Sequence, residues 1–377
     1  MVESIWRSFS RILKSRRSQT VAPRAPQLSK SRYLTGLQCE RRLWLSWHDP
    51  ERPAPSLPGS IFAVGHEVGS LAHDLFPNGV LVGGGPAEFD QAVKETAGLV
   101  ADTSVKAIFE AAFVFERVRV RADIMERLDD GRWALHEVKS STGLKPENLH
   151  DLMVQAYVIE GSGLKIASAN LVHINTGYVR GSAGIDPRGL FSTVDATAEV
   201  RAGLADVPMR IEDMHRVLAL PQAPQRRPSG HCFKPYECEF WSRCTGAKPA
   251  DWIWYLPHLR ADQFAMLDAT GVESIRDIPD DFSLTGKQRR VVQAWRAGEL
   301  VVQPSLAARL PAYEECGYLD FETLSPALPL FEGSRPYRRE AAQWSLHRRR
   351  GGALQHTEFL ADLREDPARS FAQTLLS

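Results

Sequence analysis

The clearest pattern along the chain is a pair of short segments in which apolar and polar residues alternate with period two. They cover residues 118–124 and 133–139, and Asp129-Asp130-Gly131 lies between them. Period two is typical of a strand with one buried face, and glycine can take the left-handed position of a three-residue turn. The pattern therefore predicts a β-hairpin in which Leu128 pairs with Arg132.

The predicted register brings two acidic side chains together. Counting back from the turn places Asp123 directly opposite Glu137, with Lys139 on the same face as Glu137. Facing carboxylates repel, so the pairing requires a cation between them. Two carboxylates and a lysine in this arrangement suit phosphodiester hydrolysis with hard divalent ions. The residues alone leave open a second interpretation, a solvent-facing hairpin edge with scattered charges.

Periodicity also predicts the elements around the hairpin. Apolar residues recur at helical spacing over 61–75, and a further helix is expected near 87–99. Ser29 or Ser31 could cap an earlier helix that carries Cys39 in its middle. Strands are expected over 80–82, 107–115 and 168–174. Together these elements predict an α/β fold, with a mixed sheet flanked by helices.

The hairpin residues resemble the PD-(D/E)XK nucleases of the RecB type. Arg121-Ala122-Asp123-Ile124 matches that family's first carboxylate, and His136-Glu137-Val138-Lys139-Ser140-Ser141-Thr142 matches its second carboxylate and lysine. The resemblance implies a restriction-endonuclease-like sheet in which Asp123 and Glu137 bind Mg²⁺ or Mn²⁺. Lys139 would assist the attacking water.

Two flanking segments extend the resemblance. The sequence VGHEVGSLA is similar to the family's histidine segment, which implies that His66 is the nitrogen ligand of the metal. The sequence DLMVQAY is similar to its glutamine helix, which implies that Gln155 lies beside the scissile phosphate. Many relatives carry a tyrosine four residues after this glutamine. Here Ile159 takes that place, and Tyr157 lies on another face of the helix.

A group of cysteines is the second chemical signal. Cys232, Cys238 and Cys244 fall in one short segment among charged residues and proline, and Cys39 lies far upstream. Four thiolates can converge on one soft metal centre. Some RecB-type nucleases, including exonucleases of CRISPR spacer acquisition and of double-strand-break processing, arrange cysteines in this way around a 4Fe-4S cluster. Because Cys232 and Cys238 are farther apart than in many relatives, zinc stays an alternative.

The C-terminal part suggests two further modules. A mostly helical unit contains a turn at 270–279 that resembles a helix-hairpin-helix, although an ordinary helical linker also fits. An apolar strand then ends in Asp320-x-Glu322, which resembles the first motif of DEDD exonucleases on the ribonuclease H fold. Strands are expected at 343–347 and 354–359. The family's other acidic motifs are missing, so this is predicted to be a truncated module with a vestigial second site.

From Leu28 onward, the sequence resembles an uncharacterised bacterial family that joins a RecB-type module to a DEDD-like module, here cut short. Four regions are predicted: a basic arm (1–27), the nuclease domain with the cysteines (28–248), the helical domain (249–312) and the truncated module (313–377).

Composition adds a few limits to this hypothesis. No window is long and apolar enough to span a bilayer, and five scattered cysteines favour a reducing cytoplasm over a secreted disulfide framework. A formal net charge of zero does not exclude nucleic acid, because binding depends on local basic patches. We therefore expect a cytoplasmic, metal-dependent DNA nuclease, with exonuclease action as the first expectation. The alternative is a non-catalytic nucleic-acid-binding or degenerate protein.

Overall fold

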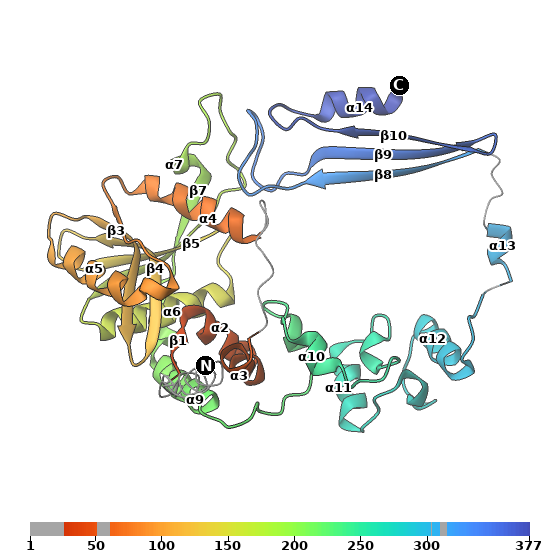
Figure 1. Cartoon of the computed structure of the whole chain (residues 1–377), viewed down its shortest axis with the longest axis horizontal. Helices are drawn as coiled ribbons and strands as arrows, with labels where there is room; N and C mark the ends of the chain where they lie inside the picture. The colour runs from red at the N-terminus through yellow and green to blue at the C-terminus, as the bar shows by residue number, and fades with distance from the viewer. Residues whose placement is uncertain (1–25, 51–60, 303, 310–314) are drawn as a thin grey trace, which may run out of the picture.

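The computed structural model describes residues 26–50, 61–302, 304–309 and 315–377. Within them, a seven-stranded mixed sheet is flanked by helices, and a separate three-stranded antiparallel sheet lies near the C-terminus (Figure 1). The predicted α/β class is confirmed. Residues 1–25 of the predicted basic arm lie outside the described residues. No described helix has the length and apolar character required to cross a membrane.

The large sheet has the strand order β2-β3-β4-β5-β6-β7, and the short β1 also pairs with β4. The strands are β1 (Leu28–Ser29), β2 (Val80–Leu81), β3 (Ala107–Phe115), β4 (Val118–Arg127), β5 (Trp133–Lys139), β6 (Ile166–Ile174) and β7 (Phe191–Asp195). The pairs β1/β4, β2/β3 and β5/β6 are parallel, and the other neighbours are antiparallel. The strands expected from periodicity are confirmed, with β4 three residues longer than the predicted segment and the other bounds within two residues.

The hairpin of β4 and β5 has the predicted register. The backbone N–H of Leu128 donates to the carbonyl of Arg132 at 2.8 Å, and Ile124 pairs with His136. Gly131 has a φ of +80°, the left-handed conformation that the turn requires and that glycine adopts without steric cost. Asp123 and Glu137 are the residues that directly follow the last paired position, Ile124 and His136, on the two strands.

Helices cover both faces of this sheet. They are α2 (Lys30–Gln38), α3 (Glu40–His48), α4 (Ile61–Ala72), α5 (Phe89–Ala101), α6 (Pro146–Gly161), α7 (Pro187–Leu190), α8 (Thr197–Gly203) and α9 (Val207–Leu218). One apolar core joins α2, α5, α6 and α9 to the sheet, and a second joins α4 and α7 to the opposite face (Figure 1). Helix α6 starts favourably, because Pro146 needs no hydrogen-bond partner there and Asn148 accepts a bond from the N–H of Lys145. It is buried along most of its length.

The prediction of one helix with Cys39 in its middle is wrong, because the structure has two helices that are separated at Cys39. Helix α2 ends at Gln38 and α3 begins at Glu40, because Cys39 is extended, with φ −162° and ψ 121°. An extended residue interrupts the helical hydrogen-bond ladder. The break lies beside the late cysteine segment, where the Gln38 side chain donates to the carbonyls of His231 and Tyr236.

The remaining elements form two further groups. The helices after the large sheet are α10 (Trp241–Thr245), α11 (Ala261–Ala269), α12 (Gly286–Ala297) and α13 (Leu306–Arg309). An apolar cluster of their own joins α11 and α12. The turn that resembles a helix-hairpin-helix leads into a single 3-10 turn, Ile275–Asp277, and α12 begins only at Gly286.

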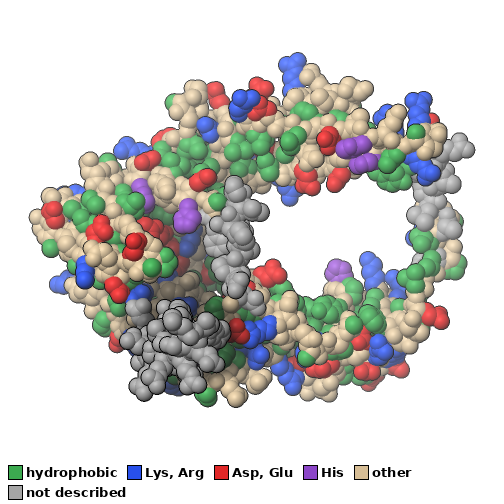
Figure 2. Space-filling view, in the orientation of Figure 1, with side chains coloured by type: hydrophobic (Ala, Val, Ile, Leu, Met, Phe, Trp, Pro, Cys, Tyr) green, Lys and Arg blue, Asp and Glu red, His purple; other side chains and the backbone are tan. Residues whose placement is uncertain are grey.

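The C-terminal sheet consists of β8 (Cys316–Leu324), β9 (Glu340–Arg350) and β10 (Ala353–Leu360), with α14 (Ala368–Leu376) against it. Both strands predicted to follow β8 are confirmed. Figure 2 shows hydrophobic side chains along this sheet, where Tyr318 and Leu354 are well exposed. The loop between β8 and β9 reaches the large sheet, since the Tyr337 hydroxyl donates to the carbonyl of Ser140.

Candidate active site

The candidate site lies where β1 and β5 approach each other along one edge of β4. Because β3 pairs with the other edge of β4, β1 and β5 must share this edge, β1 beside Val118 and Arg119 and β5 from Ile124 onward. β1 runs parallel to β4 and β5 runs antiparallel to it, so the two strands point toward each other. Asp123 lies in the gap between them.

A distortion of the sheet accompanies this position. Ala122 and Met125 of β4 both belong to the core under α6, which strict alternation of side chains would not allow. Across from Asp123, Glu110 of β3 has a φ of +56°, which is uncommon for a residue other than glycine. The kink lets Asp123 lie on the same face as α6. Strained backbone of this kind is concentrated at functional sites.

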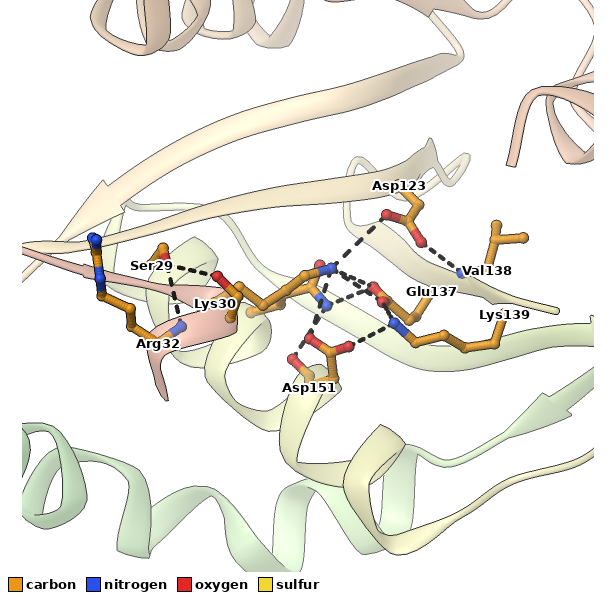
Figure 3. Close-up of polar contacts among 10 residues, drawn as sticks. Ser29, Lys30, Arg32, Asp123, Glu137, Val138, Lys139 and Asp151 are labelled. Atoms are coloured by element: carbon orange, nitrogen blue, oxygen red, sulfur yellow. Dashed lines mark hydrogen bonds and ion pairs between the residues drawn. The ribbon is translucent and has the colours of Figure 1, made fainter. Parts of the chain in front are cut away.

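Three carboxylates and two ammonium groups meet in this gap. The Lys30 Nζ lies 3.0 Å and 3.1 Å from the two carboxylate oxygens of Glu137, 3.6 Å from Asp151 Oδ1 and 3.9 Å from Asp123 Oδ1. The Lys139 Nζ lies 2.5 Å from Glu137 Oε1 and 2.8 Å from Asp151 Oδ2. In Figure 3 the two lysines reach Glu137 from opposite sides. The cation required between Asp123 and Glu137 is thus supplied here by lysine.

Hydrogen bonds fix the carboxylates further. The backbone N–H of Val138 donates to Asp123 Oδ2 at 2.8 Å, and Gln155 Nε2 donates to Glu137 Oε2 at 2.7 Å. Asp151 and Gln155 are four residues apart on α6, so both face the sheet. Asp151 Oδ1 and Gln155 Oε1 are buried and accept no hydrogen bond. The site therefore keeps two oxygen acceptors without a hydrogen-bond donor.

Burial and charge push the pKa values of the acids in opposite directions. Burial, reinforced by the charge of Glu137, raises the pKa of Asp123 to about 7. Burial acts on Glu137 in the same sense, but Lys30 and Lys139 outweigh it and hold its pKa well below the usual range. Burial would lower the lysine pKa values, yet the surrounding carboxylates raise both. Burial, reinforced by the charge of Glu137, also raises the pKa of Asp151. The two lysines therefore stay charged, and Asp123 and Asp151 bind a proton more readily than Glu137 does.

Four of the residues predicted from sequence come together here: Asp123, Glu137, Lys139 and Gln155. His66 does not join them, because it lies exposed on α4, which packs on the opposite face of the sheet. In the described part of the chain, no three His, Cys, Asp or Glu side chains are grouped so that they could hold a metal ion as they stand. The role of His66 stays a prediction.

Sequence reasoning missed two members of the cluster. Asp151 carried a usable signal, since it precedes Gln155 by one helical turn in the same motif. Lys30 carried no sequence signal beyond its charge, because it lies 107 positions before Glu137 in the chain. Its place depends on the pairing of β1 with β4, which a two-residue strand does not reveal in the sequence.

Two other predicted features lie apart from this cluster. The Tyr157 hydroxyl donates to Glu116 at 2.7 Å, in agreement with its exclusion from the site. Asp320 and Glu322 are exposed on β8 of the C-terminal sheet.

The four cysteines predicted to act together line one pocket. Cys39 enters it from the break between α2 and α3, and Cys232, Cys238 and Cys244 come from the segment around α10. Arg41, Arg42 and Arg226 also line the pocket. Burial raises the pKa of Cys232, and the nearby Cys39 and Cys244 raise it further, while burial raises that of Cys238 to about 11. Thiolates there would need a positive partner.

The C-terminal sheet is the part of the chain that matches a family model. The family model described as "Domain of unknown function (DUF2779)" matches residues 317–377, the sheet β8–β10 with α14. Among solved structures, the chain is similar to one described as "Crystal structure of SSO0001", at 13% identity and a TM-score of 0.21, over 52% of this chain and 87% of that chain. A TM-score this low supports no inference about fold or function. No curated protein matches the chain.

The raised pKa of Asp123 predicts a pH-dependent stability of the metal-free protein. Between the ordinary value of 3.8 and about 7, the folded state binds more protons at this residue than the unfolded state does. This residue's contribution to the free energy of unfolding therefore falls as pH rises through that window. Asp123→Asn removes the contribution, so the stability of the variant relative to wild type should rise by on the order of 1 kcal/mol per pH unit.

Urea denaturation in EDTA at several pH values measures this difference. Asp129→Asn, in the exposed hairpin turn, is the matched control and should give a difference that does not change with pH. A flat profile for Asp123→Asn as well would contradict the assigned environment.

Proposed function

We propose that this protein is a divalent-metal-dependent nuclease that hydrolyses phosphodiester bonds in DNA. The observation that carries the proposal is the meeting of Asp123, Glu137, Lys139 and Gln155 in one buried gap at the end of β5. These residues come from separate elements, and burying three carboxylates together is costly unless cations compensate them. A structural hairpin edge would not need such an arrangement.

The oxygen donors at the site suit Mg²⁺ or Mn²⁺. Asp123, Glu137 and Asp151 offer carboxylate oxygens, which hard divalent ions prefer. Asp151 Oδ1 and Gln155 Oε1 are buried without a hydrogen-bond donor, so a cation would satisfy them. When bound, such an ion polarises the phosphate and lowers the pKa of bound water.

The residues of the chain have separate tasks in this hydrolysis. Glu137 and Asp123 would hold the cation, and the Val138 N–H fixes the orientation of the Asp123 carboxylate. Lys139 stays protonated beside Glu137 and Asp151, so it can orient the attacking water and offset charge that develops on the phosphate. Gln155 positions Glu137 through its amide and faces the phosphate position that the RecB-type resemblance implies.

The substrate and the setting rest on the resemblance. RecB-type nucleases act on DNA, which favours DNA as the partner and exonuclease action as the mode. A reducing cytoplasm suits the five free cysteines. Asp320 and Glu322 are exposed on β8, apart from the cluster around Glu137, so the proposed chemistry is assigned to the large sheet.

We further propose that the cysteine pocket holds a 4Fe-4S cluster, with zinc as the alternative. Four sulfur donors from two distant segments line this one pocket, and the surrounding arginines would offset the negative charge of bound thiolates. Its role would be structural. It would tie α2 and α3 to the segment around α10, and so hold Lys30 and the β1 connection in place beside the site.

The proposed role of Lys139 predicts a separation of binding from cleavage. Lys139→Ala should abolish cleavage of labelled DNA in Mn²⁺, because the ammonium group acts on the reacting water and phosphate. DNA affinity should change little, because most affinity comes from contacts with the rest of the backbone. Lys94→Ala, an exposed lysine on α5, is the control and should keep both properties. Equal loss of cleavage and binding in Lys139→Ala would contradict the role.

The cysteine proposal predicts a coloured protein. Anaerobically purified wild type should be brown and contain iron and sulfide, and Cys232→Ser should lose both. Cys316→Ser, outside the pocket, is the matched control and should keep the colour. A colourless wild type with stoichiometric zinc would replace the iron-sulfur assignment with the zinc alternative.

A further inference from the structure

We propose that Lys30 occupies the position of the divalent cation between Asp123 and Glu137 in the metal-free protein, and that the cation must displace it in order to bind. This inference rests on the proposed metal-dependent function. It concerns a residue that the catalytic motifs of the sequence do not include.

The backbone around Lys30 is fixed at this place. Leu28 is fully buried, and its N–H donates to the carbonyl of Arg117 at 3.0 Å, so β1 is anchored against β4. Ser29 then caps helix α2, because its hydroxyl accepts a bond from the N–H of Arg32 at 3.2 Å. Lys30 is the first residue of that helix, directly after the strand that points at the gap.

The Lys30 ammonium lies where the carboxylate oxygens converge. It contacts both oxygens of Glu137 and lies within 4 Å of Asp123 and Asp151. A hard divalent ion would seek the same point, since it needs several carboxylate oxygens at once. Figure 3 shows the end of Lys30 between Asp123 above and Asp151 below. The ammonium and the ion therefore compete for the same oxygens.

Among the groups that bond to Glu137, Lys30 is the one that a cation would displace. Lys139 is also held by Asp151 at 2.8 Å, and Gln155 is also held by the Asp151 carbonyl at 3.1 Å. Lys30 has the longer contacts, and its ammonium alone of the three lies between Glu137 and Asp123. Its flexible side chain can also move without shifting the backbone.

This arrangement has two consequences. Lys30 keeps the repelling carboxylates assembled before the cation arrives, and it weakens cation binding because an ion pair must first be broken. Once displaced, the ammonium stays tethered at the start of α2. The site would then be assembled in advance while it binds the cation only weakly.

The test is Mn²⁺ binding measured by titration calorimetry without nucleic acid. Lys30→Met should bind Mn²⁺ more tightly than wild type by roughly tenfold, a typical size for coupling between two bound groups. Lys30→Arg keeps the positive charge and should not gain affinity. Lys94→Met removes an exposed lysine on α5 and should match wild type.

Thermal unfolding supplies a second readout. In EDTA, Lys30→Met should melt below wild type because the carboxylates lose a counter-ion, and Mn²⁺ should raise its melting temperature more than that of wild type. If Lys30→Met does not fold in EDTA, Lys30→Gln serves for the same comparison. Equal or weaker Mn²⁺ binding by the neutral variants would overturn the inference.

The outcomes separate this inference from the proposed function. If wild type binds Mn²⁺ and cleaves DNA but the neutral Lys30 variants bind no more tightly, only the role of Lys30 fails. If wild type binds Mn²⁺ no better than Asp123→Ala does and cleaves nothing, both the function and the inference fail.

Discussion

Three carboxylates that meet inside a protein must be balanced by positive charge, and here two lysines supply it. Asp123, Glu137 and Asp151 would otherwise repel one another, and Glu137 and Asp151 are buried where little water can screen them. Lys30 and Lys139 approach from opposite sides, and the two Glu137 oxygens are shared among both lysines and Gln155. Removing one partner of a buried ion pair typically lowers the free energy of unfolding by ~3–5 kcal/mol. The strands and helices that carry these residues must therefore keep them together.

The fold satisfies that constraint by bringing three parts of the chain to one gap. β5 carries Glu137 and Lys139, α6 carries Asp151 and Gln155, and β1 delivers Lys30 from the opposite direction. The kink at Glu110 and Asp123 turns the remaining carboxylate toward them. The cysteine pocket lies at the far end of α2, so a metal bound there would stabilise the same connection from its other end.

Local patterns predicted the parts of this site that depend on local structure. Period two and a glycine turn were enough to place Asp123 against Glu137, because an antiparallel register is fixed once the loop is known. The position of Lys30 depends on a parallel contact between segments far apart in sequence, and no periodicity encodes it. The break at Cys39 was missed for a related reason. The surrounding residues suit one continuous helix, and the break lies where the neighbouring Gln38 contacts a distant segment of the chain.

For the C-terminal sheet, the resemblance predicted the strands but gives no function. The strands after β8 were expected from the resemblance to the DEDD motif and are present, and the family model that matches this sheet describes a domain of unknown function. Its acidic pair stays exposed on β8, so the chemistry proposed for this protein belongs to the large sheet.

Metal-dependent hydrolysis at Asp123 is tested by cleavage of labelled single- and double-stranded DNA in Mn²⁺ and in EDTA. Wild type is compared with Asp123→Ala and with Asp129→Ala, which changes an exposed acid in the adjoining turn. We expect cleavage by wild type and Asp129→Ala in Mn²⁺, and none in EDTA or by Asp123→Ala. Absence of cleavage by well-folded, metal-loaded wild type, or equal cleavage by Asp123→Ala, would contradict this expectation.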